Sequence, residues 1–64
     1  MLEVIDFIDL LVDERMPIKV WDCNKEGYIY EGAACELPSK LEYYEVVGID
    51  VPEDEQIVIN VDSE

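Results

Sequence analysis

Histidine is absent from the 64-residue sequence, and serine occurs only at Ser39 and Ser63. Nucleophilic catalysis needs a nucleophile with a general base beside it, and histidine is the side chain that most often supplies the base. The sequence also lacks a glycine-rich loop of the kind that cradles phosphate groups. We therefore predict a protein that is not an enzyme and that uses no cofactor.

Ligands for a metal ion are equally scarce. A structural zinc site normally takes four Cys or His ligands, and the chain offers only Cys23 and Cys35. The segment "VPEDEQ" (51–56) lacks the alternating ligands and the central glycine of a calcium loop, so we predict no metal site. Cys23 is expected in an exposed turn and Cys35 as a small buried residue. Nothing in the sequence favours a disulfide between them.

Basic residues are also few, because four Lys and Arg face seventeen Asp and Glu, which gives a net charge of −13. Such a field repels nucleic acids and anionic membranes and attracts basic proteins, so direct binding of nucleic acid is not expected. The beginning of the chain has no basic segment, and Asp6 and Asp9 interrupt its apolar residues. We therefore expect neither a signal peptide nor a membrane span, and a cytoplasmic location.

Half of the residues are hydrophobic, and most of the aliphatic ones are Ile, Val and Leu, so a compact core is expected despite the charge. The length predicts a single acidic domain over residues 1–64. Residues 3–14 have the i, i+3, i+4, i+7 apolar spacing of an amphipathic helix. Alternating apolar residues predict four strands, at 17–22, 28–31, 45–51 and 56–61.

The expected fold class is α+β, in which the N-terminal amphipathic helix packs on a small, mainly antiparallel four-stranded sheet in the order α-β-β-β-β. The turn "DCNKEG" (22–27) joins the first two strands in one hairpin, and the acidic turn "PEDE" (52–55) joins the last two in another. The segment 33–44 has no clean period and predicts a short turn or one helical turn.

Trp21 is the first candidate for a partner contact. Strand alternation points Ile18 and Val20 to one face of the sheet and Lys19 and Trp21 to the other. If the helix covers Ile18, Trp21 lies on the open face or under residues 33–43, and Trp is a favoured anchor of protein interfaces. The open face would also carry Lys19, Val46, Asp50, Val58 and some of the tyrosines.

Four carboxylates recur every three or four residues along the predicted helix with no Lys or Arg between them: Glu3, Asp6, Asp9 and Asp13. Each like-charge pair at this spacing costs about 0.2–0.5 kcal/mol, and negative charge near a helix C-terminus is unfavourable as well. One interpretation is a solvated surface, and the other is an interface in which a basic partner relieves the repulsion. The turn at 52–55 would add a second acidic patch, Glu53, Asp54 and Glu55.

In length, charge and α+β pattern, the whole chain resembles the small acidic proteins that bacteriophages and mobile elements encode, with anti-CRISPR and other anti-defence inhibitors prominent among them. The resemblance is one of type and rests on the two acidic patches together with Glu36, Glu42 and Glu45. It implies a stoichiometric inhibitor in a bacterial host cell. Its carboxylates would take the place of nucleic acid on a basic enzyme such as a CRISPR effector.

The sequence therefore leaves two functions open. The first is a non-enzymatic inhibitor or interaction module that binds a basic, nucleic-acid-binding protein surface by negative-charge mimicry, with the two acidic patches and Trp21 as its contact residues. The alternative is a small structural module or homodimer that uses the aromatic sheet face or an edge strand. In that case the charge would serve solubility only.

Overall fold

The computed structural model describes residues 2–51 and 56–63. Within them, one short helix, α1 (Val4–Ile8), precedes four strands: β1 (Pro17–Asp22), β2 (Gly27–Ala33), β3 (Glu45–Asp50) and β4 (Ile57–Asp62). Two 3₁₀ turns, η1 (Ala34–Glu36) and η2 (Ser39–Leu41), lie between β2 and β3. The predicted α+β class and the order of one helix followed by four strands are confirmed.

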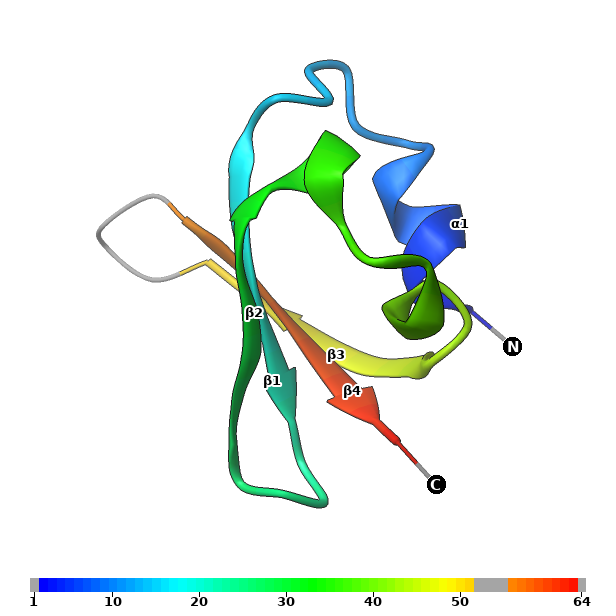
Figure 1. Ribbon diagram of the computed structural model, residues 1–64, viewed down its shortest axis with the longest axis vertical. Coiled ribbons are helices and arrows are strands. Elements are labelled where there is room, and N and C mark those ends of the chain that lie inside the picture. Colours follow the sequence, from blue (N-terminus) through cyan, green and yellow to red (C-terminus); the bar gives the residue numbers. More distant parts are fainter. Residues whose placement is uncertain (1, 52–55, 64) are drawn as a thin grey trace.

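The strands form a mixed sheet in the order β2-β1-β4-β3 (Figure 1). The pairs β1–β2 and β3–β4 are antiparallel, as predicted, whereas the central strands β1 and β4 are parallel. Two of the three pairings thus agree with the predicted mainly antiparallel sheet, and the parallel central pairing, which makes the sheet mixed, was not predicted. Pairing β1 with β4 places the two strands with the most buried positions side by side at the centre of the sheet.

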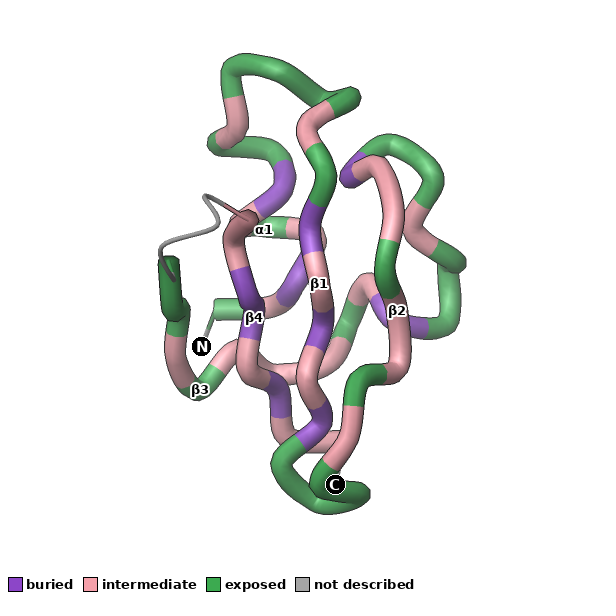
Figure 2. Tube along the Cα trace, turned by 90° about the vertical axis from the view of Figure 1, so that its left-hand side faces the viewer, coloured by how far each residue is buried: buried purple, intermediate pink, exposed green. Residues whose placement is uncertain are grey.

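The hydrophobic core lies between α1 and one face of this sheet. Val4 and Ile8 of α1 pack against apolar side chains of β1 and β4, where Val20 and Ile59 are cross-strand partners. Figure 2, which faces the opposite side of the sheet, shows buried positions concentrated in these two strands with α1 behind them. Each buried aliphatic side chain contributes about 1.5–3 kcal/mol relative to exposure.

The helix ends much earlier than the predicted 3–14, at Ile8. After it, the N–H of Leu11 donates to the carbonyl of Ile8, so the chain continues in a tight turn, and Leu10 is 76% exposed. A longer helix would add Asp13 and Glu14 to its C-terminal end, where the helix dipole is already negative. The predicted amphipathic helix is therefore correct in type and wrong in length.

Backbone bonds from the segment before β3 hold the start of α1. The N–H groups of Val4 and Ile5 donate to the carbonyls of Tyr44 and Glu42, at 3.1 and 2.9 Å. The Asp6 carboxylate accepts the N–H of Glu3 at 3.0 Å. These bonds satisfy N–H groups that a helix leaves unpaired in its first turn, so a helix too short to be stable alone is fixed on the sheet.

A register shift in the β3–β4 pair corrects one predicted orientation. The shift lies between Val46 and Gly48, so Val46 pairs with Val61 and packs against the core, while Val47 is exposed. The prediction that Val46 lies on the open face is therefore wrong. Strict alternation fails here because a bulge inserts one residue and reverses the orientation of the residues before it.

Asp22 ends β1 and is fully buried. Its carboxylate accepts the N–H of Asn24 at 2.9 Å, which forms the first turn of the β1–β2 connection. Burial alone would raise the pKa of this carboxyl. Hydrogen bonds from the Ser63 hydroxyl and from backbone N–H groups act in the opposite direction, as does the positive charge of Lys25. Together they hold the pKa below its usual value.

Candidate functional site

The two faces of the sheet differ in chemistry. One is covered by residues 2–16 and 34–44, which we call the acidic cap, and these residues include seven Asp and Glu but only two basic residues. No described segment lies over the opposite face (Figures 1 and 2). We call it the aromatic sheet face, and strand register places on it Lys19, Trp21, Tyr28, Glu31, Asp50, Val58 and Asn60.

The structure divides the predicted contact residues between these surfaces. Trp21 lies on the aromatic sheet face, whereas the carboxylates of the predicted helical row lie in the acidic cap: Glu3, Asp6, Asp9 and Asp13. The carboxylates of the predicted second patch lie outside the described residues: Glu53, Asp54 and Glu55. One flat partner surface therefore cannot contact Trp21 and the helical carboxylates together.

The carboxylates of the cap do not form one continuous helical row. Asp6 lies within α1, Asp9 is its C-cap and Asp13 lies in the following loop. Asp6 accepts a backbone N–H, and Asp13 accepts the N–H of Arg15 at 3.0 Å. These two carboxylates have local structural roles. Among the described residues, the exposed Asp9 side chain accepts no such bond.

A shallow pocket of about 180 Å³ lies within the cap, between α1 and η1. Its apolar lining is buried or partly buried, whereas Glu14 and Cys35 are exposed and Glu42 is partly exposed. The apolar lining residues are Ile5, Ile8, Ala34 and Leu37. The pocket therefore combines an apolar interior with two carboxylates and a thiol.

Backbone hydrogen bonds fix both carboxylate-bearing residues of the pocket. The carbonyl of Glu14 accepts the N–H of Cys35 at 2.7 Å, and the carbonyl of Glu42 accepts the N–H of Ile5 at 2.9 Å. Glu14 is thereby joined to η1 and Glu42 to α1. No basic side chain is among the described residues that line this pocket.

The structure agrees with the prediction for one cysteine and disagrees with the prediction for the other. Both thiols are free and exposed, so the prediction for Cys23 is confirmed and that for Cys35 is wrong. Within η1 the buried position is taken by Ala34, which turns Cys35 outward. Tyr30 lies close by, and its pKa is raised by burial and further by the negative charges of Glu36 and Cys35.

The pocket was not predicted from the sequence because its residues come from three separate segments. Glu14 follows the helix, Cys35 lies in η1 and Glu42 precedes β3. No sequence signal marked the pocket, because residues 33–44 had no clean period and contain only two acids, Glu36 and Glu42.

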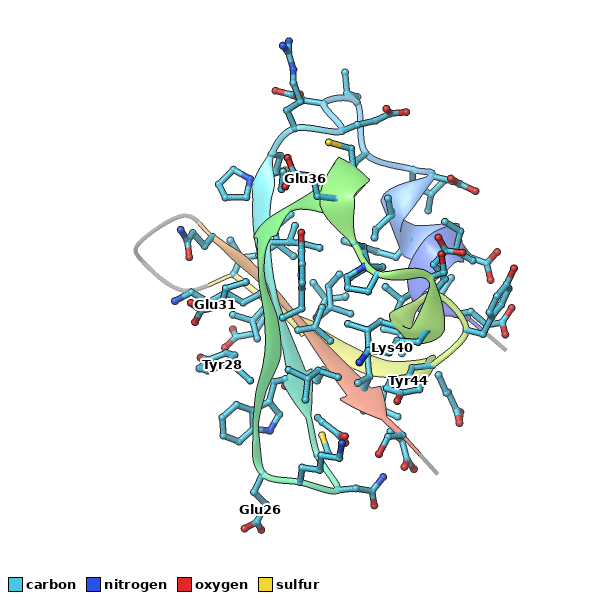
Figure 3. The ribbon with its side chains drawn as sticks, in the orientation of Figure 1. Glu26, Tyr28, Glu31, Glu36, Lys40 and Tyr44 are labelled. Atoms are coloured by element: carbon cyan, nitrogen blue, oxygen red, sulfur yellow. The ribbon has the colours of Figure 1, made fainter. Side chains whose placement is uncertain are left out.

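Aromatic side chains lie together on the other face of the sheet. The rings of Trp21 and Tyr28 contact edge to face, with centroids 5.0 Å apart, and Lys19 Nζ lies 5.4 Å from the centroid of the Tyr28 ring. Figure 3 shows Tyr28 and Glu31 pointing away from the cap, whereas Tyr44 lies on the cap side. This face therefore already contains its own cation–π contact.

The described residues contain no group of three or more His, Cys, Asp or Glu side chains placed to hold a metal ion. None of the described helices has the length and apolar character that a bilayer crossing requires. Comparison with protein-family models, with curated proteins and with solved structures finds no significant match to this chain. The function is therefore inferred from the two surfaces themselves.

Proposed function

We propose that the protein is a non-enzymatic binding module that docks its acidic cap onto a basic surface of another protein. The observation that carries the proposal is the excess of acids in the segments that cover one side of the sheet, which have seven carboxylates and two cations. Asp9 and Glu36 are exposed there. Complementary potentials of this kind steer association and fix the register of a complex.

The negative charge is not neutralised within the described molecule. Asp62 aside, no carboxylate in residues 2–51 and 56–63 forms an ion pair with a Lys or Arg side chain. A surface that only has to be solvated can alternate Lys with Asp and Glu, which removes the repulsion between neighbouring carboxylates. A basic partner would remove it in the complex, so binding should weaken as salt is added.

The finer proposal is mimicry of nucleic acid. The cap combines seven carboxylates with two cations, and a nucleic acid likewise presents closely spaced negative charges to its protein partners. The proposed target is the groove of a nucleic-acid-binding enzyme, such as a CRISPR effector, in a bacterial cytoplasm.

Two variants with the same net charge test this proposal. Each replaces three acids by Lys and changes the net charge from −13 to about −7. The cap variant combines Asp9→Lys, Asp13→Lys and Glu36→Lys. The control variant changes acids outside the cap: Glu26→Lys, Glu31→Lys and Asp50→Lys (Figure 3). Tagged proteins would be used to capture partners from bacterial extract, with elution in rising salt.

The proposal predicts a nucleic-acid-binding protein that wild type and the control variant retain, that added DNA or RNA displaces, and that the cap variant fails to retain. Equal retention by both variants would contradict a role for the cap. If both variants lose the captured protein equally, the attraction depends on net charge alone and not on the cap. Thermal unfolding of each variant shows whether it is folded.

Self-association through the aromatic sheet face is the second candidate, because Trp21 and the half-exposed Tyr28 lie there uncovered. Four strands of six or seven residues give a flat area of roughly 19 by 20 Å, or about 380 Å². Stable interfaces bury about 800 Å² on each partner, so such a dimer would be weak. Sedimentation tests it, since a salt-insensitive dimer that Trp21→Ala disrupts would support this candidate over the first.

A further inference from the structure

We infer that the pocket of the acidic cap binds one cationic side chain, Lys or Arg, of the partner protein. The inference rests on the proposed function, because it assumes that the cap is the contact surface. It adds the place within the cap where the partner is anchored and the kind of side chain that is recognised.

The size of the pocket fits one side chain. Its volume of about 180 Å³ is below the roughly 300–1,000 Å³ typical of small-molecule and cofactor sites. The pocket is therefore smaller than a typical cofactor site, and the end of one long side chain fits it.

The chemistry of the lining selects a cation with an apolar stem. Lys and Arg bury their methylene groups against apolar surface and keep the charged end in a polar environment. Ile5, Ile8 and Leu37 offer the apolar contact, and Glu14 and Glu42, which also line the pocket, bring the negative charge. An acidic side chain would be repelled, and an apolar one would desolvate both carboxylates without compensation.

The pocket is also organised before a partner arrives. The backbone bonds from Cys35 to Glu14 and from Ile5 to Glu42 connect the lining residues across three segments. Little ordering of the backbone is then needed on binding, which lowers the entropic cost of association. A charge pair formed in a partly enclosed pocket is also less screened by salt than one on the open surface.

The native thiols allow a direct test with small probes. Cys35 lines the pocket, and Cys23 is exposed in the β1–β2 turn, remote from the pocket lining. The probes are two methanethiosulfonates of similar size, one carrying an aminoethyl cation and one a sulfonatoethyl anion. With either reagent the thiolate forms a mixed disulfide and methanesulfinate leaves. Both reagents react with the same thiolate. The ratio of the cationic reagent's rate to the anionic reagent's rate at one cysteine therefore does not depend on the fraction of that cysteine that is ionised.

We expect the cation-to-anion rate ratio to be about tenfold higher at Cys35 than at Cys23, because the acids Glu14 and Glu42 line the same pocket as Cys35. The double variant Glu14→Gln, Glu42→Gln should remove this excess. The charge-matched variant Glu31→Gln, Asp50→Asn, at positions on the aromatic sheet face outside the turn of Cys23 and the pocket lining, should leave it unchanged. Equal ratios at the two thiols in the wild-type protein would overturn the inference.

A second measurement separates this inference from the proposed function. The Glu14→Gln, Glu42→Gln variant should lose at least tenfold in affinity for the partner captured through the cap, although Asp9, Asp13 and Glu36 are unchanged. If the Glu14→Gln, Glu42→Gln variant binds like wild type while the cap variant fails to bind, the cap is the interface and the inferred cation-binding pocket is wrong. If the cap variant also binds like wild type, the proposed function itself fails.

Discussion

Replacing Gly32 by alanine should destabilise the protein through a contact with Tyr30. Gly32 has a φ of +157°, a backbone conformation that L residues rarely adopt. A Cβ at this position would lie 2.9 Å from Tyr30 Oη and 3.3 Å from Cζ. Tyr30 cannot move away freely, because its hydroxyl donates to the carbonyl of Ala33 at 2.6 Å and its ring packs against the core.

Two contributions set the expected magnitude. A strained backbone position costs about 1–3 kcal/mol, and loss of the Tyr30 hydrogen bond costs about 0.5–1.5 kcal/mol, so we expect a loss of about 2–4 kcal/mol. The whole chain of 64 residues should have a free energy of unfolding of only about 3–10 kcal/mol. At about 2.1 cal/mol/K per residue, the midpoint of thermal unfolding should fall by roughly 15–30 °C.

Thermal unfolding followed by circular dichroism measures this, with Gly48→Ala as the matched control. A Cβ at Gly48 meets nothing closer than Asn60 Nδ2 at 3.9 Å, so this variant should unfold within about 5 °C of wild type. Adding Tyr30→Phe to Gly32→Ala should recover part of the loss by removing the closest contact. A Gly32→Ala protein as stable as wild type, or no less stable than Gly48→Ala, would refute the reasoning.

Three further predictions concern the core and the titrating groups. Ile59→Ala, at a fully buried position, should lower the free energy of unfolding by about 2–5 kcal/mol in urea titrations, whereas Val47→Ala, at a position 53% exposed, should change it by less than about 0.5 kcal/mol. Because the folded pKa of Asp22 is lowered, its carboxylate adds stability above the usual pKa of 3.8 that is lost as pH falls through the folded pKa. The stability difference between wild type and Asp22→Asn should therefore shrink as the solution is acidified, and a difference that grows in acid would contradict the lowered pKa. Tyr30 should ionise at higher pH than a free tyrosine, and Tyr30→Phe should remove the latest step of an absorbance titration at alkaline pH.

Local sequence signals predicted the strands because each depends on neighbours in the chain. The alternation of Ile18 and Val20, and of Ile59 and Val61, marks which side chains face the core, and the structure confirms it. The parallel pairing of β1 with β4 depends on how two hairpins meet, and no local pattern encodes that. The bulge at Val46 was missed for the same reason, since it is visible only in the cross-strand register.

The helix length was overestimated because apolar spacing ignores the charges at the end of the pattern. Leu10 continues the apolar stripe of the sequence and is nevertheless exposed. The short helix receives its backbone bonds from Tyr44 and Glu42, about forty residues away in the sequence. Tertiary contacts therefore hold the beginning of α1, and local charge limits its extension beyond Ile8.

The repeated carboxylates of the cap have two different explanations. Asp6 and Asp13 accept backbone hydrogen bonds, so their charges contribute to local structure. Glu14 and Glu42 are held through their backbone carbonyls, and a neutral glutamine would make the same bonds. Their carboxylates add repulsion without contributing to these contacts, and both line the same apolar pocket. We propose that a cationic side chain of a partner protein, seated in this pocket, supplies the compensating interaction.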